Sequence, residues 1–219
     1  MLASTRITVL CSIAFLLPGL SLAQSHGPLG IDRPVTFDDS GIYKRHTQLL
    51  IQDLTFVAIV GGALWEGGDS RLGKTYWQSL DSAALGAVAS TGLKYVFTRK
   101  RPSQTNDPNM WFKGKGNYSF PSGEVTFMSA AVTPFVLEYG HDHPLVYALE
   151  LLPLYDAIAR VKVHAHWQSD VLAGWALGFG AGYLAHQQGQ SLDLARHARR
   201  RGGGLQDALL SARGLLRSK

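Results

Sequence analysis

Residues 167–186 read WQSDVLAGWALGFGAGYLAH, an apolar stretch in which three glycines are spaced four residues apart. Residues four apart lie on one face of an α-helix, so Gly174, Gly178 and Gly182 leave a strip without side chains along that face. A neighbouring helix can approach such a strip closely. The sequence therefore predicts a helix from Trp167 to His186 that packs tightly against another helix.

Four segments upstream also have helical apolar patterns. They cover residues 42–65, 76–97, 122–139 and 145–163, with Ser122 as a candidate helix cap and Pro134 expected to bend the third. The sustained apolar–polar alternation of a half-buried strand is missing from the sequence. The expected fold class is all-α, a compact bundle of about five to six core helices. Residues 98–121 form a long connecting loop, and loops of that length are usually functional.

Composition agrees with a folded body. The chain has 219 residues, of which 46% are hydrophobic and 17% charged, which excludes an intrinsically disordered chain. The one cysteine, Cys11, lies in an N-terminal segment that resembles a signal peptide over residues 1–23. We therefore expect neither a disulfide framework nor a metal or other cofactor held by cysteine. An uncleaved membrane anchor is the alternative for this segment.

The resemblance to a signal peptide predicts export to a bacterial periplasm. The expected organisation of the remaining chain is an irregular lead-in over 24–40, a helical domain over 41–189 and a basic tail with an amphipathic helix over 190–219. The longest uninterrupted apolar run of the domain, residues 171–185, is shorter than the about 20 residues of a membrane span. A soluble body is therefore the first expectation. A membrane-embedded bundle is the alternative, because charges that face a bundle interior are tolerated.

The formal net charge of +5 is concentrated in the tail, which suits contact with an anionic membrane surface. Nucleic-acid binding is not expected of an exported protein. Within the nearly neutral domain, residues 94–115 carry a local group of cations: Lys94, Arg99, Lys100, Arg101, Lys113 and Lys115. Such a group suggests an anionic ligand.

Three sets of residues have the chemistry of a phosphate site with a nucleophile. They are Lys94 with Arg101-Pro102, then Pro121-Ser122-Gly123-Glu124 at a predicted helix start, then Arg160 with His166 and Asp170. Lysine supplies a point charge and arginine a planar fork for phosphate oxygens, while a helix N-terminus adds amide N–H groups. Asp170 lies four residues after His166, so its carboxylate can hold one ring nitrogen and aim the other at phosphorus.

The order and spacing of these sets resemble the three-part signature of the type 2 phosphatidic acid phosphatase and vanadium haloperoxidase superfamily, K-x6-RP, PSGH and SR-x5-H-x3-D. Residues 166–170, HWQSD, are similar to the soluble class A bacterial acid phosphatases in particular. The resemblance implies that His166 forms a phosphohistidine, with Asp170 orienting it and no metal involved. It also implies which groups bind the phosphoryl oxygens: Lys94, Arg101, Arg160, Ser122 and the Gly123 amide.

Glu124 departs from the family pattern, in which this position is a histidine that protonates the leaving group. (Ala159, in place of the family's serine, is a milder change.) A protonated carboxyl can act as the general acid, and nearby cations lower the pKa of Glu124 while a bound phosphate raises it. We therefore expect a working phosphatase biased to acidic pH or to good leaving groups.

Three functions remain open at this point. The first is an exported enzyme that hydrolyses soluble phosphomonoesters. The second is a membrane-associated phosphatase of phosphatidate, isoprenoid diphosphate or lipid A. The third is a catalytically impaired module that binds phosphate without turnover. The sequence leaves the oligomeric state open, a homo-oligomer included.

Overall fold

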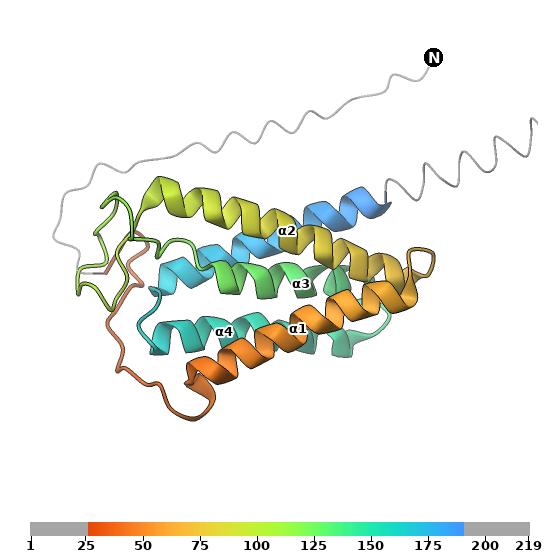
Figure 1. The fold of residues 1–219 in the computed structure, drawn as a ribbon, viewed down its shortest axis with the longest axis horizontal. Coiled ribbons are helices and arrows are strands. Elements are labelled where there is room, and N and C mark those ends of the chain that lie inside the picture. Colours follow the sequence, from red (N-terminus) through yellow and green to blue (C-terminus); the bar gives the residue numbers. More distant parts are fainter. Residues whose placement is uncertain (1–25, 191–219) are drawn as a thin grey trace, which may run out of the picture.

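The computed structural model describes residues 26–190, which form a bundle of helices with no β-strand among them. The elements are the 3-10 helix η1 (Gly41–Tyr43), α1 (Arg45–Glu66), α2 (Arg71–Phe97), α3 (Gly123–Tyr139), the 3-10 helix η2 (Pro144–Glu150) and α4 (Leu151–Lys162). A last helix covers residues 168–190. Figure 1 shows these helices lying lengthwise beside one another, which confirms the all-α fold class. The predicted signal peptide and nearly all of the basic tail lie outside the described residues.

α3 forms the centre of the bundle, and its middle from Val125 to Pro134 is almost entirely buried. The last helix packs against it through its glycines. A Cβ atom added to any of three glycines would collide with atoms of Ser122 or α3: Gly174, Gly178 and Gly182. The close helix packing predicted from the glycine spacing is therefore confirmed.

Two helix boundaries differ from the sequence prediction. α2 begins at Arg71, earlier than the predicted start, because the Ser70 hydroxyl accepts a hydrogen bond from the amide of Gly73 at 2.9 Å and caps the helix. The single helix predicted over 145–163 is wrong, since η2 and α4 share this segment. Pro153 has no N–H group, so it is tolerated only in the first turn of an α-helix, and α4 begins two residues before it.

Pro134 inside α3 leaves the carbonyl of Ala130 without its usual helical N–H donor. The hydroxyl of Ser82, on α2, donates to this carbonyl at 2.6 Å. The sequence placed Pro134 in this helix, but the partner from α2 has no local sequence signal. A polar contact therefore ties the two central helices together.

The distribution of side chains between interior and surface is unusual for a water-soluble domain. Many buried side chains between α2, α3 and the last helix are small or polar: Ser79, Ser82, Ser90, Thr126, Ser129 and Thr133. Many large apolar side chains are exposed along the helices, among them Leu54, Val57, Leu64, Trp65, Val88, Leu151 and Leu184. Exposed apolar side chains in such numbers are typical of surfaces that contact a membrane or a partner.

Among the described helices, α1 is the one long and apolar enough to cross a membrane, with 22 residues that are mostly exposed. The 12 residues of α4 extend about 18 Å, less than the about 30 Å of a hydrocarbon core. Residues 26–190 thus contain one candidate span.

Candidate active site

The three predicted sets of residues meet at one end of the bundle. Lys94 lies in the last turn of α2, Glu124 in the first turn of α3 and Arg160 in the last turn of α4. His166 lies in the turn that joins α4 to the last helix. Figure 1 shows that these helix ends, the loop 98–121 and the start of α1 all lie at the same end of the molecule.

The His166 ring is buried and held by the backbone. Its Nδ1 atom lies 2.6 Å from the carbonyl oxygen of Ser119. A carbonyl only accepts hydrogen bonds, so Nδ1 carries the ring hydrogen and Nε2 keeps its lone pair. Burial lowers the pKa of His166 to about 4, an effect to which the charges of Lys94 and Arg160 add and which Asp170 opposes. The ring is therefore neutral at neutral pH and keeps the Nε2 lone pair.

The sequence led us to expect that Asp170 accepts the ring hydrogen of His166. In the structure it does not. Its nearer carboxylate oxygen lies 3.8 Å from Nδ1 of His166, too far for a hydrogen bond. That oxygen accepts from the Ser119 hydroxyl at 2.5 Å and from the amide of Trp167 at 2.9 Å. Asp170 therefore ties together the two backbone segments that carry Ser119 and Trp167.

From the sequence, Arg99 was named only as one member of a group of cations. In the structure it supports the site through two buried ion pairs. It is fully buried and pairs with Asp170 at 2.5 Å and with Asp32 at 2.6 Å. Its guanidinium lies over the ring of Trp111 at 4.2 Å. Asp32 belongs to the segment predicted as an irregular lead-in, and it also accepts the amide of Ser169. No sequence signal pointed to Asp32.

Lys94, Arg101 and Arg160, which we call the cationic cluster, lie within electrostatic reach of one another. Burial lowers the pKa of Lys94 to about 8, and the charges of Arg101 and Arg160 contribute to that shift. The Lys94 ammonium donates to the carbonyls of Tyr118 and Pro121. Arg160 is nearly buried and donates from Nη1 to Gln48 at 3.0 Å. The arrangement favours an anion.

The start of α3 adds hydrogen-bond donors beside the cationic cluster. Ser122 precedes the helix as its cap residue, but its side chain makes no capping hydrogen bond. Its Oγ and the Nε of Arg160 are buried without a hydrogen-bond partner among the described residues. The Gly123 position lies against Lys94, since a Cβ there would be 3.5 Å from the Cε of that lysine. These donors suit phosphoryl oxygens.

Glu124 is held as a carboxylate. Arg45, from α1, donates to both of its oxygens at 2.7 and 2.8 Å, and Arg160 lies 3.3 Å away. Burial raises the pKa of Glu124, but the hydrogen bond from Arg45 and the charge of Arg160 outweigh burial and lower it to about 2. In the free protein this side chain is therefore ionised and is no ready proton donor. Sequence reasoning missed Arg45.

Two further polar residues contact this carboxylate or lie next to it. Gln52 of α1 donates from Nε2 to Glu124 at 3.0 Å and to Asp156 at 3.2 Å. Asp156 is 1% exposed and lies one turn before Arg160 on α4. Neither residue was singled out from the sequence, although the four-residue spacing of Asp156 and Arg160 would have placed both on one helical face.

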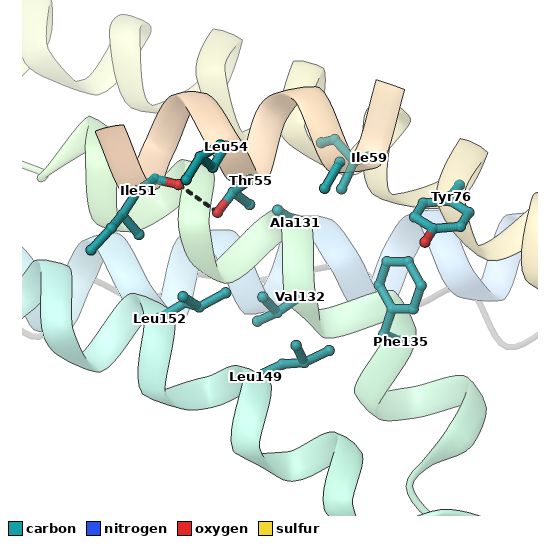
Figure 2. A pocket seen from close by; sticks show the side chains of 11 residues that line it. Ile51, Leu54, Thr55, Ile59, Tyr76, Ala131, Val132, Phe135, Leu149 and Leu152 are labelled. Carbon is teal, nitrogen blue, oxygen red and sulfur yellow. Dashed lines mark hydrogen bonds between the residues drawn. The ribbon is translucent and has the colours of Figure 1, made fainter. Parts of the chain in front are cut away.

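Two apolar pockets flank the site. One, with a volume of about 530 Å³, lies between α1, α3, η2 and α4, and Figure 2 shows Ile51, Leu54, Val132 and Leu152 around it. Its lining includes Ile51, the residue before Gln52, and extends to Tyr76 near the start of α2. The other, of about 500 Å³, is lined by aromatic residues of the loop 98–121 and by the last helix, on the Asp170 side.

The chain also resembles known proteins. The family model of the PAP2 superfamily matches residues 75–193. A lipid A 1-phosphatase of Porphyromonas gingivalis is 34% identical over 118 residues, which are 52% of this chain and 24% of that protein. An undecaprenyl-diphosphatase of Sulfolobus acidocaldarius is 30% identical over 107 residues, which are 48% of this chain and 51% of that protein.

Among solved structures, LpxE of Aquifex aeolicus matches with 18% identity and a TM-score of 0.37, over 70% of this chain and 99% of that chain. The two curated relatives match over about a quarter and about half of their own lengths. The PAP2 family model covers more than half of the present chain and includes all three motifs, from Lys94 to Asp170. The chain belongs to the PAP2 superfamily.

Proposed function

We propose that this protein is a membrane-associated phosphatase that hydrolyses the phosphate ester of a lipid alcohol through a phosphoryl group carried by His166. The observation that carries the proposal is the buried, neutral His166 ring, whose Nε2 is left free because Ser119 binds Nδ1. The lipid class is supported by the relatives, one named a lipid A 1-phosphatase and the other an undecaprenyl-diphosphatase.

The proposed reaction has two steps. Nε2 of His166 attacks phosphorus, the bond to the lipid oxygen breaks, and the oxygen leaves with a proton from an acid of the site. The cationic cluster, the Ser122 hydroxyl and the Gly123 amide stabilise the charge on the phosphoryl oxygens. Water then cleaves the phosphohistidine and releases inorganic phosphate. The positive ring of the intermediate is stabilised by the Ser119 carbonyl and the nearby Asp170.

Membrane association is supported by the exposed apolar side chains. Leu54, Val57 and Leu64 of α1 are each more than half exposed, and α1 has the length and composition of a membrane span. The start of α1 carries Arg45 and Gln52 at the catalytic end. We place α1 in the membrane with this end at the headgroup level, where a lipid phosphate lies.

The pocket of Figure 2 suits the apolar part of such a lipid. In-line attack by His166 requires the leaving oxygen to lie on the opposite side of phosphorus, and the family pattern assigns that side to the position of Glu124. Ile51, the residue before Gln52, lines the pocket, and the lining is apolar apart from Thr55 and Tyr76. A hydrocarbon chain attached to the leaving oxygen would enter it.

One observation favours a second candidate, a phosphate-binding module without turnover. Glu124 is ionised and forms an ion pair with Arg160. Its carboxylate therefore competes with a phosphoryl group for Arg160, at a position where the family has an acid. Such a module would bind inorganic phosphate and form no phosphoenzyme.

The test uses the full chain in detergent micelles with three phosphate esters: p-nitrophenyl phosphate, a short-chain alkyl phosphate and phosphatidate. We expect phosphate release from phosphatidate with a higher kcat/KM than from the short-chain ester. His166→Ala should abolish release, while His141→Ala, at a fully exposed histidine in the turn after α3, should match the parent.

Trapping separates the candidates. With phosphate-labelled substrate and rapid quenching at high pH, the enzyme should retain a label on His166 that the His166→Ala variant lacks. Phosphate binding with neither label nor release would replace the proposal by the binding module. Release from all esters with equal kcat/KM would retain the phosphatase but reject the lipid preference.

A further inference from the structure

A buried carboxyl group, Asp156, and a partly exposed one, Glu124, meet at one amide beside the cationic cluster. The Nε2 of Gln52 donates to Glu124 at 3.0 Å and to Asp156 at 3.2 Å. The other carboxyl oxygen of Asp156 is buried without a hydrogen-bond partner among the described residues. An ionised carboxylate with an unpartnered buried oxygen costs far more free energy than a neutral, protonated carboxyl in the same place. The geometry therefore favours a neutral Asp156.

The neighbouring charged groups also favour different protonation states for the two carboxyl groups. Glu124 is paired with Arg45 and Arg160, while no ion pair to Asp156 is found in residues 26–190. The charged or titratable groups that face Asp156 are Glu124 from α3, Arg45 from α1, and Arg160 and Tyr155 on its own helix. Burial and the negative charge of Glu124 raise the pKa of Asp156 to about 7, and Arg160 and Arg45 only partly oppose them. Two like charges so close favour one shared proton.

We propose that Glu124 and Asp156 act as one carboxyl pair that carries a single proton, and that Asp156 is the reservoir of the proton that Glu124 delivers to the leaving oxygen. The inference rests on the phosphatase activity proposed above. Asp156 is a positioning residue in this scheme because it acts through Glu124, which occupies the position of the family's acid.

The proton balance closes over one turnover. A bound phosphoryl group competes with Glu124 for Arg160, and its negative charge raises the pKa of Glu124. The proton passes from Asp156 to Glu124, then to the leaving oxygen as the phosphorus–oxygen bond breaks, and both carboxyls are left ionised. The water that attacks the phosphohistidine gives a proton to Glu124. The pair then holds one proton again when phosphate departs.

The decisive variant is Asp156→Asn, which keeps the shape of the side chain and removes the proton site. The assay compares an alkyl phosphate, whose alcohol needs a proton to leave, with p-nitrophenyl phosphate, whose phenolate does not. We expect alkyl turnover to fall by about 10² or more and aryl turnover by less than about tenfold. The alkaline limb of the alkyl pH profile should move to lower pH, because Glu124 alone has a low pKa.

Three further variants complete the design. Asp156→Glu retains a carboxyl and should restore alkyl turnover and the alkaline limb. Glu124→Gln should lose alkyl turnover as Asp156→Asn does. Asp53→Asn changes an exposed carboxylate on α1, next to Gln52, and should behave as the parent. Retained aryl turnover shows that each variant is folded.

Two kinetic outcomes would overturn the inference. Equal loss of alkyl and aryl turnover in Asp156→Asn, with an unmoved alkaline limb, would make Asp156 merely structural. Full alkyl turnover in Asp156→Asn, with loss in Glu124→Gln, would show that Glu124 works alone.

An infrared measurement tests the pair apart from turnover. The parent should show the carbonyl band of a protonated carboxylic acid that disappears as pH rises through about 7, and Asp156→Asn should lack this band. An inactive parent with the band would reject the proposed phosphatase and keep the pair. An active parent without the band would reject the pair and keep the phosphatase.

Discussion

The ring Nδ1 of His166 lies 2.6 Å from the carbonyl oxygen of Ser119 and 3.8 Å from the carboxylate of Asp170. The backbone carbonyl therefore fixes the tautomer of the ring, and Asp170 fixes the segment that carries this carbonyl. Asp170 accepts hydrogen bonds from the hydroxyl of Ser119 and from the amide of Trp167. The ring of the proposed nucleophile is therefore held through Ser119 rather than by a direct hydrogen bond to a carboxylate.

This relationship predicts a graded loss in Asp170→Asn. Asparagine keeps the size of the side chain but removes the charge that strengthens the hydrogen bonds to Ser119 and Trp167, each worth about 1.5–3 kcal/mol. We expect kcat to fall by about 10- to 100-fold. The measurement is the rate of phosphoenzyme formation in Asp170→Asn, compared with the rate in His166→Ala. A folded Asp170→Asn enzyme as inactive as His166→Ala would mean that the carboxylate itself orients the ring.

Arg99→Gln is expected to destabilise the fold strongly. Arg99 is fully buried between Asp32 and Asp170, so its removal leaves two buried carboxylates without their cation. Breaking a buried ion pair in this way costs about 3–5 kcal/mol. Denaturant unfolding of the full chain in micelles measures the loss, with Lys113→Gln, at an exposed cation of the same loop, as the control. Equal stability of the two variants would contradict a supporting role for Arg99.

His166 is expected to remain neutral to unusually low pH. Its pKa is lowered to about 4 by burial and by the charges of Lys94 and Arg160, so protonation, which would remove the nucleophile, occurs only below that pH. An NMR titration of ring-labelled histidines can follow this group, whose signal is identified by its absence in His166→Ala. A midpoint near the ordinary value of about 6.5 would show that water reaches the ring.

The bundle and the three motifs could be predicted from the sequence because each depends on local spacing. The four-residue spacing places three glycines on one helical face: Gly174, Gly178 and Gly182. The motif pattern likewise fixes the positions of Lys94, Arg160 and His166. The groups that tune these residues come from distant segments. Asp32 reaches Arg99 across 67 residues, and Arg45 reaches Glu124 across 79. Only tertiary packing brings such pairs together.

The same limit explains why the role of Glu124 was open from the sequence. Its position in the motif indicated a general acid. The cations nearby in the sequence indicated only that its pKa would be lowered by their charge. The structure adds Arg45, whose two hydrogen bonds decide the balance in favour of the carboxylate. A residue type at a motif position does not define its protonation state without its partners.

Glu124→His tests this dependence on partners. A histidine at this position must be protonated to act as an acid, and Arg45 and Arg160 would disfavour its positive form. The single variant is therefore expected to be poorly active on alkyl phosphates. The double variant Glu124→His, Arg45→Gln removes one of the two opposing charges and should be the more active of the two. The kcat of both with an alkyl phosphate measures the difference, and Arg45→Gln alone is the control. A single variant as active as the double would mean that Arg45 does not act on this position.

Chain-length dependence tests the pocket of Figure 2. Ala58 lines this pocket on α1, six residues after Gln52 and exposed on one side to solvent, so a phenylalanine there would block the distal part without reaching the catalytic end. Ala58→Phe is expected to raise KM for long-chain alkyl phosphates by about tenfold, the effect of losing about two buried methylene groups. KM for short-chain esters and for p-nitrophenyl phosphate should stay unchanged. Ala173→Phe fills the second pocket and is the matched control. Selective loss of long-chain binding in Ala173→Phe alone would place the hydrocarbon chain on the Asp170 side, and with it the leaving group away from Glu124.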